Sequence, residues 1–205
     1  MQITPISPER LAGEVAELVM ARPGRVRLAV DGPPAADPDT LGERVAERLR
    51  ELGRATVLVR AADFLRPASV RLEFGREDPD ELLDRWLDAA GLRREVLDPA
   101  APDGSGRVLP RLWDATADRA YREPYVNLPA TGVVILTGAL LLGRGLPLDL
   151  TVHLHMTEAA LTRHTPQPTR WTLPAYTRYE KEHTPTTAAD LVILSDHPHR
   201  PALRR

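Results

Sequence analysis

The sequence RLAVDGPPAADPDT, residues 27–40, decides the fold of this chain. A short valine-rich run over 26–30 ends in Asp31-Gly32, and such a run is typical of a strand that is buried on both faces. A proline-rich loop follows, and Asp39 or Thr40 can cap the helix that comes next. A buried strand, a loop and a capped helix are the opening of a parallel α/β unit.

Outward from this stretch, short apolar runs alternate with segments that have helical spacing and capping residues. The expected strands are 26–30, 56–59, 133–136, 150–154 and 191–194, and the expected helices follow Ser7, Asp39 or Thr40, Asp78 and Thr157, with a last helix over 171–183. Loops are expected over 99–129, with a short hairpin around 108–125. We therefore expect one domain over 1–205, a three-layer α/β/α fold with a mostly parallel five-stranded sheet, and a frayed tail over 196–205.

Composition excludes several classes of function. The chain has 205 residues, no cysteine and a net charge of −2. The absence of cysteine excludes disulfides, thiol catalysis and thiolate zinc sites, and the charge disfavours a nucleic-acid partner. The longest apolar stretch, 132–142, is shorter than the ~20 residues that span a bilayer, and the first residues do not read as a secretory signal. We expect a cytoplasmic protein with no membrane partner.

The loop after the first strand stands where phosphate-binding loops occur, with the pattern G-x-x-x-x-G-K-[ST]. Gly32 matches the first glycine, whereas the other motif positions hold Asp37 for the second glycine, Pro38 for the lysine and Asp39 for the hydroxyl, with Thr40 one place late. Carboxylates at a helix N-terminus oppose a phosphate, and proline removes a backbone donor. The loop is therefore predicted not to hold phosphate.

Six stretches of the chain carry a resemblance to a known family. They are RLAVDG (27–32), ADFLRPASVRLEFGREDPDELLDRWLD (62–88), LRREVLDP (92–99), SGRVLPRLWDATADRA (105–120), LTGALLLGRGLPLDLTVHL (136–154), and RWTLPAYTRY (170–179) with ADLVI (189–193). In this order they resemble the uridine-kinase-like branch of P-loop nucleoside kinases, particularly its short actinobacterial members. The resemblance implies a P-loop kinase fold, with a lid near 163–170.

The chain departs from this family at three functional positions. The first is the degenerate phosphate loop. At the second, Ala62 stands where the family has an aspartate that acts as base, which leaves Asp63. At the third, Thr137 stands where an aspartate organises magnesium, and Ala139 where a second carboxylate is often found. Because phosphoryl transfer depends on positioning and charge neutralisation, these losses predict a protein that does not transfer phosphate from ATP.

The nucleoside side of the implied cleft is better kept than the phosphate side. Its arginines, aspartates and aromatic rings can bind a flat polar ligand by stacking and hydrogen bonds. The candidate ligand-binding residues are Phe64, Arg66, Trp113, Asp114, Arg119, Arg163 and Tyr176, and the candidate catalytic residues are Asp63, His155 and Tyr125. The alternative is that Arg66 and Asp114 anchor loops and that Trp113 belongs to the core.

His153 and His155 flank Leu154 on an expected strand, so alternation places both imidazoles on one face. This is the geometry of a metal-binding pair, with His164 or Glu158 as a third ligand. The alternative is that hydrogen bonds satisfy both rings, and we expect no cofactor and no metal. His155 can act as a general acid or base, since imidazole exchanges protons near neutral pH.

Tyr176 and Glu180 are four residues apart and share a helix face, which either points into the cleft or packs with a solvated carboxylate. The apolar residues Leu82, Leu83, Trp86 and Leu87 form core or, alternatively, a homodimer surface.

Two classes of function remain open. In the first, the cleft is repurposed for ATP-independent acid/base chemistry on a small organic molecule, such as cyclisation, isomerisation, elimination or hydrolysis. In the second, the protein is a non-catalytic pseudokinase that binds a ligand or a partner protein. A residual nucleoside kinase is a further alternative.

Overall fold

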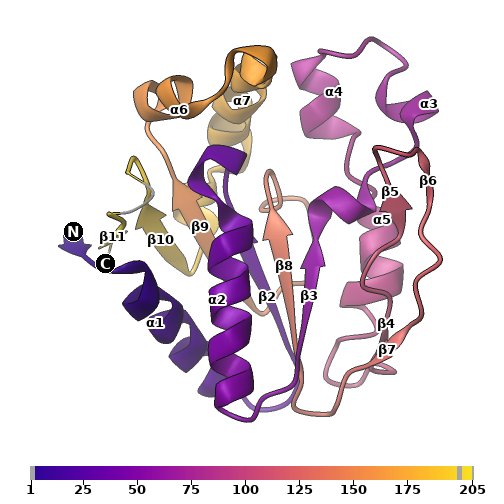
Figure 1. Ribbon diagram of the computed structural model, residues 1–205, viewed down its shortest axis with the longest axis vertical. Coiled ribbons are helices and arrows are strands. Elements are labelled where there is room, and N and C mark those ends of the chain that lie inside the picture. The colour runs from indigo at the N-terminus through magenta and orange to yellow at the C-terminus, as the bar shows by residue number, and fades with distance from the viewer. Residues whose placement is uncertain (1–2, 198–199, 205) are drawn as a thin grey trace.

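A seven-stranded sheet forms the centre of the protein, whose computed structural model describes residues 3–197 and 200–204 (Figure 1). Its order is β1 (Ile3–Pro5), β11 (Ala202–Arg204), β10 (Leu191–Leu194), β9 (Leu150–His155), β2 (Val26–Asp31), β8 (Val133–Gly138) and β3 (Thr56–Arg60). The strands from β10 to β3 are parallel, as the apolar runs predict. The α/β class is confirmed, and β1 and β11 add two strands to the expected five.

The end of the chain corrects one expectation. Residues 202–204 are not frayed but form β11, which pairs antiparallel with both β10 and β1. Leu203 is buried in the core between them. A strand of three residues is too short to show a period, so only its partners define it. Residues 198, 199 and 205 of the expected tail lie outside the described residues.

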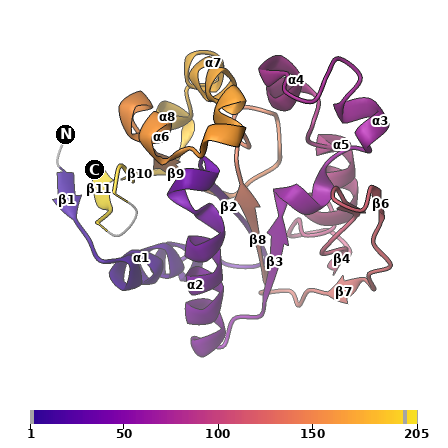
Figure 2. The same cartoon turned by 45° about the horizontal axis from the view of Figure 1, so that its top comes forward.

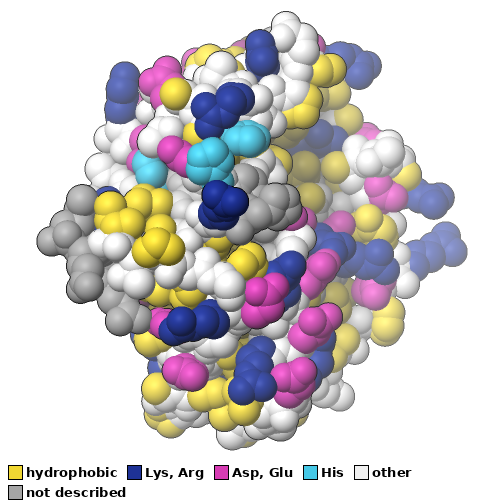
Figure 3. Space-filling view, turned by 60° about the vertical axis from the view of Figure 1, so that its left-hand side comes forward, with side chains coloured by type: hydrophobic (Ala, Val, Ile, Leu, Met, Phe, Trp, Pro, Cys, Tyr) yellow, Lys and Arg dark blue, Asp and Glu magenta, His cyan; other side chains and the backbone are white. Residues whose placement is uncertain are grey.

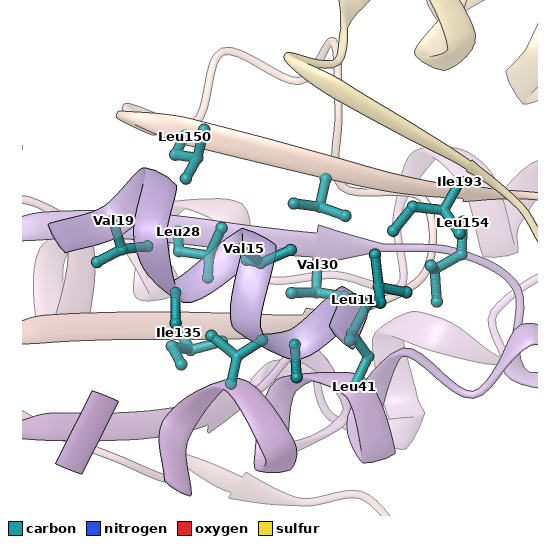
Figure 4. Packing of buried hydrophobic residues seen from close by; sticks show 14 of the residues in the cluster. Leu11, Val15, Val19, Leu28, Val30, Leu41, Ile135, Leu150, Leu154 and Ile193 are labelled. Atoms are coloured by element: carbon teal, nitrogen blue, oxygen red, sulfur yellow. The ribbon is translucent and has the colours of Figure 1, made fainter. Parts of the chain in front are cut away.

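The sheet is buried on both faces because its central strands are apolar throughout. On one face, Val133 and Ile135 pack with helices α1 (Pro8–Met20) and α2 (Pro38–Glu51), and Figure 4 shows this core. On the other face, Val134 and Leu136 pack beneath α5 (Ala89–Leu92) and η3 (Arg93–Leu97). Side chains alternate between the faces, so each strand contributes to both layers.

Helix boundaries follow their caps, with two differences from the expectation. Asp37 caps α2, rather than Asp39 or Thr40, and the helix expected after Asp78 divides into α4 (Pro79–Asp84) and α5 around Trp86. The other elements are η1 (Pro34–Ala36), η2 (Ala61–Phe64), α3 (Ala68–Arg71), α6 (Glu158–His164), η4 (Gln167–Thr172), α7 (Leu173–His183), α8 (Pro185–Ala188) and two small ribbons, β4 (Arg107–Val108) with β7 (Val126–Asn127) and β5 (Trp113–Asp114) with β6 (Arg119–Ala120).

The carboxyl ends of the parallel strands lie at one edge of the sheet, where ligands bind in folds of this class. Figure 2 shows α6, α7 and α8 gathered over the ends of β9 and β10. Among the described residues, no helix combines the length and the apolar character needed to cross a membrane.

Candidate functional site

A buried polar cluster lies at the carboxyl end of β2. Asp31, the last residue of this strand, is fully buried, and its Oδ2 lies 2.7 Å from Nδ1 of His153 on β9. The two residues are register partners in neighbouring strands, so their side chains leave the sheet together. The carboxylate also accepts the hydroxyl proton of Tyr179 at 3.0 Å and the backbone N–H of Leu141 at 2.8 Å. Three donors thus fix the orientation of Asp31.

Glu180 on α7 extends this cluster to the second histidine. Its Oε1 lies 3.3 Å from Nε2 of His153 and 3.4 Å from Nδ1 of His155. The histidine rings have centroids 6.1 Å apart, on the same face of β9, as strand alternation predicts. Asp31, His153, Glu180 and His155 therefore form one continuous chain of polar contacts.

The cluster concentrates charge in a buried place. Burial works to lower the pKa of His153, but its hydrogen bonds to Asp31 and Glu180 outweigh burial and raise that pKa to about 9. Burial would raise the pKa of Glu180, and its hydrogen bonds to His153 and His155 instead lower it to about 2. At neutral pH the cluster holds an imidazolium between two carboxylates. Burial and the charge of Asp31 raise the pKa of Tyr179, which stays a neutral donor.

A cavity of about 640 Å³ opens beside the cluster, between the end of β9 and helices α6 and α7. This volume lies in the range of small-molecule sites. The cavity is bordered by Gly32, His155, Tyr176, Glu180 and Lys181, which is the single lysine of the chain. Of the cluster, Glu180 and His155 reach furthest out, with 36% and 25% of their side chains exposed against 3% for His153.

The loop that stands in the place of a phosphate loop is closed by its own side chains. Asp37 has a left-handed backbone, with φ of 53°, and its Oδ1 accepts the N–H of Thr40 at 3.2 Å. Pro38 begins α2 and offers no N–H. In the same turn, the carboxylate of Asp39 accepts the hydroxyl proton of Thr137, which is fully buried on β8.

Two of the candidate catalytic and ligand-binding residues, His155 and Tyr176, line this cavity. So do His153, Glu158 and Glu180, which the sequence analysis considered as metal ligands or as part of a helix face. Tyr176, on α7, packs against the hydrophobic core, and burial raises the pKa of its hydroxyl. Phe64 is fully buried in the hydrophobic cluster on the other face, so its ring is not available to stack on a ligand. Asp63 is half-buried, which raises its pKa against the lowering effects of Tyr121 and Arg111.

The remaining candidates lie outside the lining of this cavity. Trp113 donates to Asp118 at 3.1 Å, and Asp114 accepts two backbone N–H groups of its own turn at 3.0 Å, in line with the alternative that it anchors a loop. Tyr125 donates to Glu95 at 2.7 Å. Arg66 lies on the segment after η2, and its backbone N–H donates to the carbonyl of Trp86. Arg119 on β6 and Arg163 on α6 are both exposed.

Asp31 and Tyr179 complete the cluster but were not among the sequence-derived candidates. Asp31 had a visible signal, because a carboxylate at the end of an otherwise apolar, buried strand needs buried partners. Tyr179 had none, since a tyrosine on an amphipathic helix is common in a core.

One face of the molecule carries both signs of charge. On the face shown in Figure 3, basic and acidic side chains are interspersed, with histidines among them.

No protein-family model and no curated protein sequence matches the chain. Several solved structures are similar to it. A possible uridine kinase from Bacillus stearothermophilus is 19% identical, with a TM-score of 0.72 over 89% of this chain and 97% of that one. A protein provisionally assigned as a fructose transport system kinase, from Silicibacter sp. TM1040, is 21% identical, with a TM-score of 0.60 over 89% of this chain and 92% of that one. At these identities the likeness shows the fold, which is that of the P-loop kinases.

Proposed function

We propose that this chain keeps the P-loop kinase fold without transferring phosphate from ATP. Instead of transferring phosphate, the protein binds a small organic molecule in the cavity beside β9. Acid/base chemistry on this molecule centres on the cluster of Asp31, His153, Glu180 and His155.

The contact between Asp39 and Thr137 carries the first half of this proposal. The resembling kinases have a hydroxyl on the helix and an aspartate on the strand, and magnesium is held between them. Here the residue types are exchanged, and the two side chains bond directly to each other. A magnesium ion would have to break this partly buried contact and compete with Arg60, which pairs with Asp39 at 3.6 Å. The loop has no lysine to help neutralise the phosphates.

The helix terminus supports the same conclusion. The positive end of a helix attracts phosphate through its free N–H groups. In α2 the N–H of Thr40 is already bonded to Asp37, and Asp39 adds a second negative charge in the first turn. An arriving phosphate would meet the carboxylates of Asp37 and Asp39, the second of them paired with Arg60 at 3.6 Å, where a kinase provides free N–H groups.

The second half rests on the cluster and the cavity together. Buried titratable groups with shifted pKa values that border a cavity mark candidate sites of chemistry. Asp31 orients His153, His153 orients Glu180, and Glu180 contacts His155 at the cavity. His155 and Glu180 are thus positioned to exchange protons with a bound ligand.

Ligand capture tests the proposal with a variant that fills the cavity. The purified protein is incubated with a mixture of common polar metabolites and washed, and the retained molecules are identified by mass spectrometry. Thr177 lines the cavity, so Thr177→Trp should block it. Retention by the wild type and loss in this variant is the expected result, provided that circular dichroism shows both to be folded. Equal retention by both proteins, or none by the wild type, would refute the cavity as the binding site.

Phosphate transfer is tested separately with labelled ATP and uridine. We expect no labelled nucleotide above the blank, whereas magnesium-dependent labelling of uridine would overturn the first half of the proposal.

A further inference from the structure

His153, His155 and Glu180 bring three ligand atoms together at the cavity. One nitrogen or oxygen from each lies within 4.8 Å of the others. We propose that these three residues bind a divalent transition-metal ion of the zinc type, with Asp31 as the positioning residue behind it. The inference rests on the proposed function for the cavity that the ion would face, and it deepens that proposal by naming the reactive group.

The spacing of the ligand atoms fits such an ion. At metal–ligand distances of about 2.0–2.1 Å, two ligands of a tetrahedral zinc ion lie about 3.3–3.4 Å apart. Oε1 of Glu180 lies 3.3 Å from Nε2 of His153 and 3.4 Å from Nδ1 of His155. The ion would take the place of the proton that His153 now shares with Glu180, and the two histidine nitrogens lie within 4.8 Å of each other.

Asp31 supplies the outer support that metal-binding histidines usually have. A histidine ligand commonly donates its second ring N–H to a carboxylate, which fixes the tautomer and the ring orientation. Asp31 contacts Nδ1 of His153 at 2.7 Å, leaving Nε2 for the ion. Tyr179 and the N–H of Leu141 hold this carboxylate in turn. Tyr179 and Leu141 thus hold Asp31, and Asp31 holds the ring of His153 in the orientation that a metal ligand needs.

The ligand set also indicates the class of metal and of chemistry. Two imidazoles and a carboxylate suit zinc and its neighbours better than magnesium or calcium, which prefer all-oxygen sites. Three protein ligands beside a cavity leave a fourth position open, which is typical of catalytic rather than structural zinc. A zinc-bound water ionises near pH 7, so among the reactions considered the site favours hydrolysis.

Metal content tests the inference without any substrate. The purified protein is stripped with EDTA and titrated with Zn²⁺ by calorimetry, and Co²⁺ absorption reports the coordination number. We expect one equivalent of Zn²⁺ and a tetrahedral Co²⁺ spectrum. His155→Ala and Glu180→Gln should each weaken binding at least ~10-fold, and Asp31→Asn ~10–100-fold. His197→Ala, which removes an exposed histidine elsewhere, should bind like the wild type.

Two results would overturn the inference. One is the absence of saturable Zn²⁺ binding by the folded wild type. The other is an equal affinity in the wild type and the folded His155→Ala and Glu180→Gln variants, which would place the ion elsewhere. In either case, capture of a metabolite that Thr177→Trp abolishes would leave the proposed binding function standing, so the two failures are distinguishable.

Discussion

Replacing Asp31 with asparagine should destabilise the protein most at neutral and acidic pH. The variant keeps an oxygen for the N–H of Leu141 but loses the charge that holds His153 as an imidazolium. The raised pKa of His153, about 9 against 6.5, corresponds to a stabilisation of ~2.5 kcal/mol at pH 7, and Asp31 and Glu180 share it. Removing one partner of a buried ion pair costs ~3–5 kcal/mol. We therefore expect a loss of ~2–4 kcal/mol at pH 7.

The sign of the pH dependence follows from the direction of this shift. Because the folded pKa of His153 is raised, its contribution is complete below the unfolded pKa and disappears as the pH rises through about 9. The difference in unfolding free energy between wild type and Asp31→Asn should thus shrink from pH 6 to pH 9.5. Urea denaturation in EDTA measures it without a contribution from bound metal. A difference that is constant, or that grows with pH, would refute the imidazolium assignment.

Three further substitutions test the packing. Gly42→Ala should cost ~1–3 kcal/mol in urea denaturation despite its better helix propensity, because the new Cβ would collide with the side chain of Thr137, and a gain in stability would show that α2 can move away. Asp149→Asn should cost ~1–3 kcal/mol, since Asp149 bonds Arg27 at 2.7 and 2.9 Å. These bonds lower the pKa of Asp149 although burial opposes them, so the cost should shrink as acid protonates the folded carboxyl below the usual range of an aspartate. A cost that does not change between neutral and strongly acidic pH would count against the pair. Leu203→Ala should cost ~2–4 kcal/mol by thermal or urea unfolding, whereas no effect would mean that β11 is not docked in solution.

The parallel sheet could be predicted because its strands are apolar on both faces, which is a local property of each run. The short edge strands could not. β1 and β11 have three residues each, and their pairing depends on contacts between opposite ends of the chain. The break between α4 and α5 was also missed, since Leu82, Leu83, Trp86 and Leu87 keep helical spacing across it.

The candidate site was predictable in part for the same reason. Alternation alone places His153 and His155 on one face, and helical spacing places Glu180 beside Tyr176. Their partner Asp31 is 122 residues from His153, and Tyr179 is 148 residues from Asp31, so only the strand order brings them together. Asp63 and Tyr125 remain predictions of the resemblance to nucleoside kinases, and alanine substitutions will test them once a turnover can be measured.

Calorimetric titration with ATP and Mg²⁺, with AMP and uridine alongside, tests the central claim most directly. The closed N-terminus of α2 and the contact between Asp39 and Thr137 predict no nucleotide binding at concentrations that saturate a working kinase. Clear magnesium-dependent binding of ATP would contradict the account, because the exchanged pair would then hold the ion and another residue would replace the missing lysine.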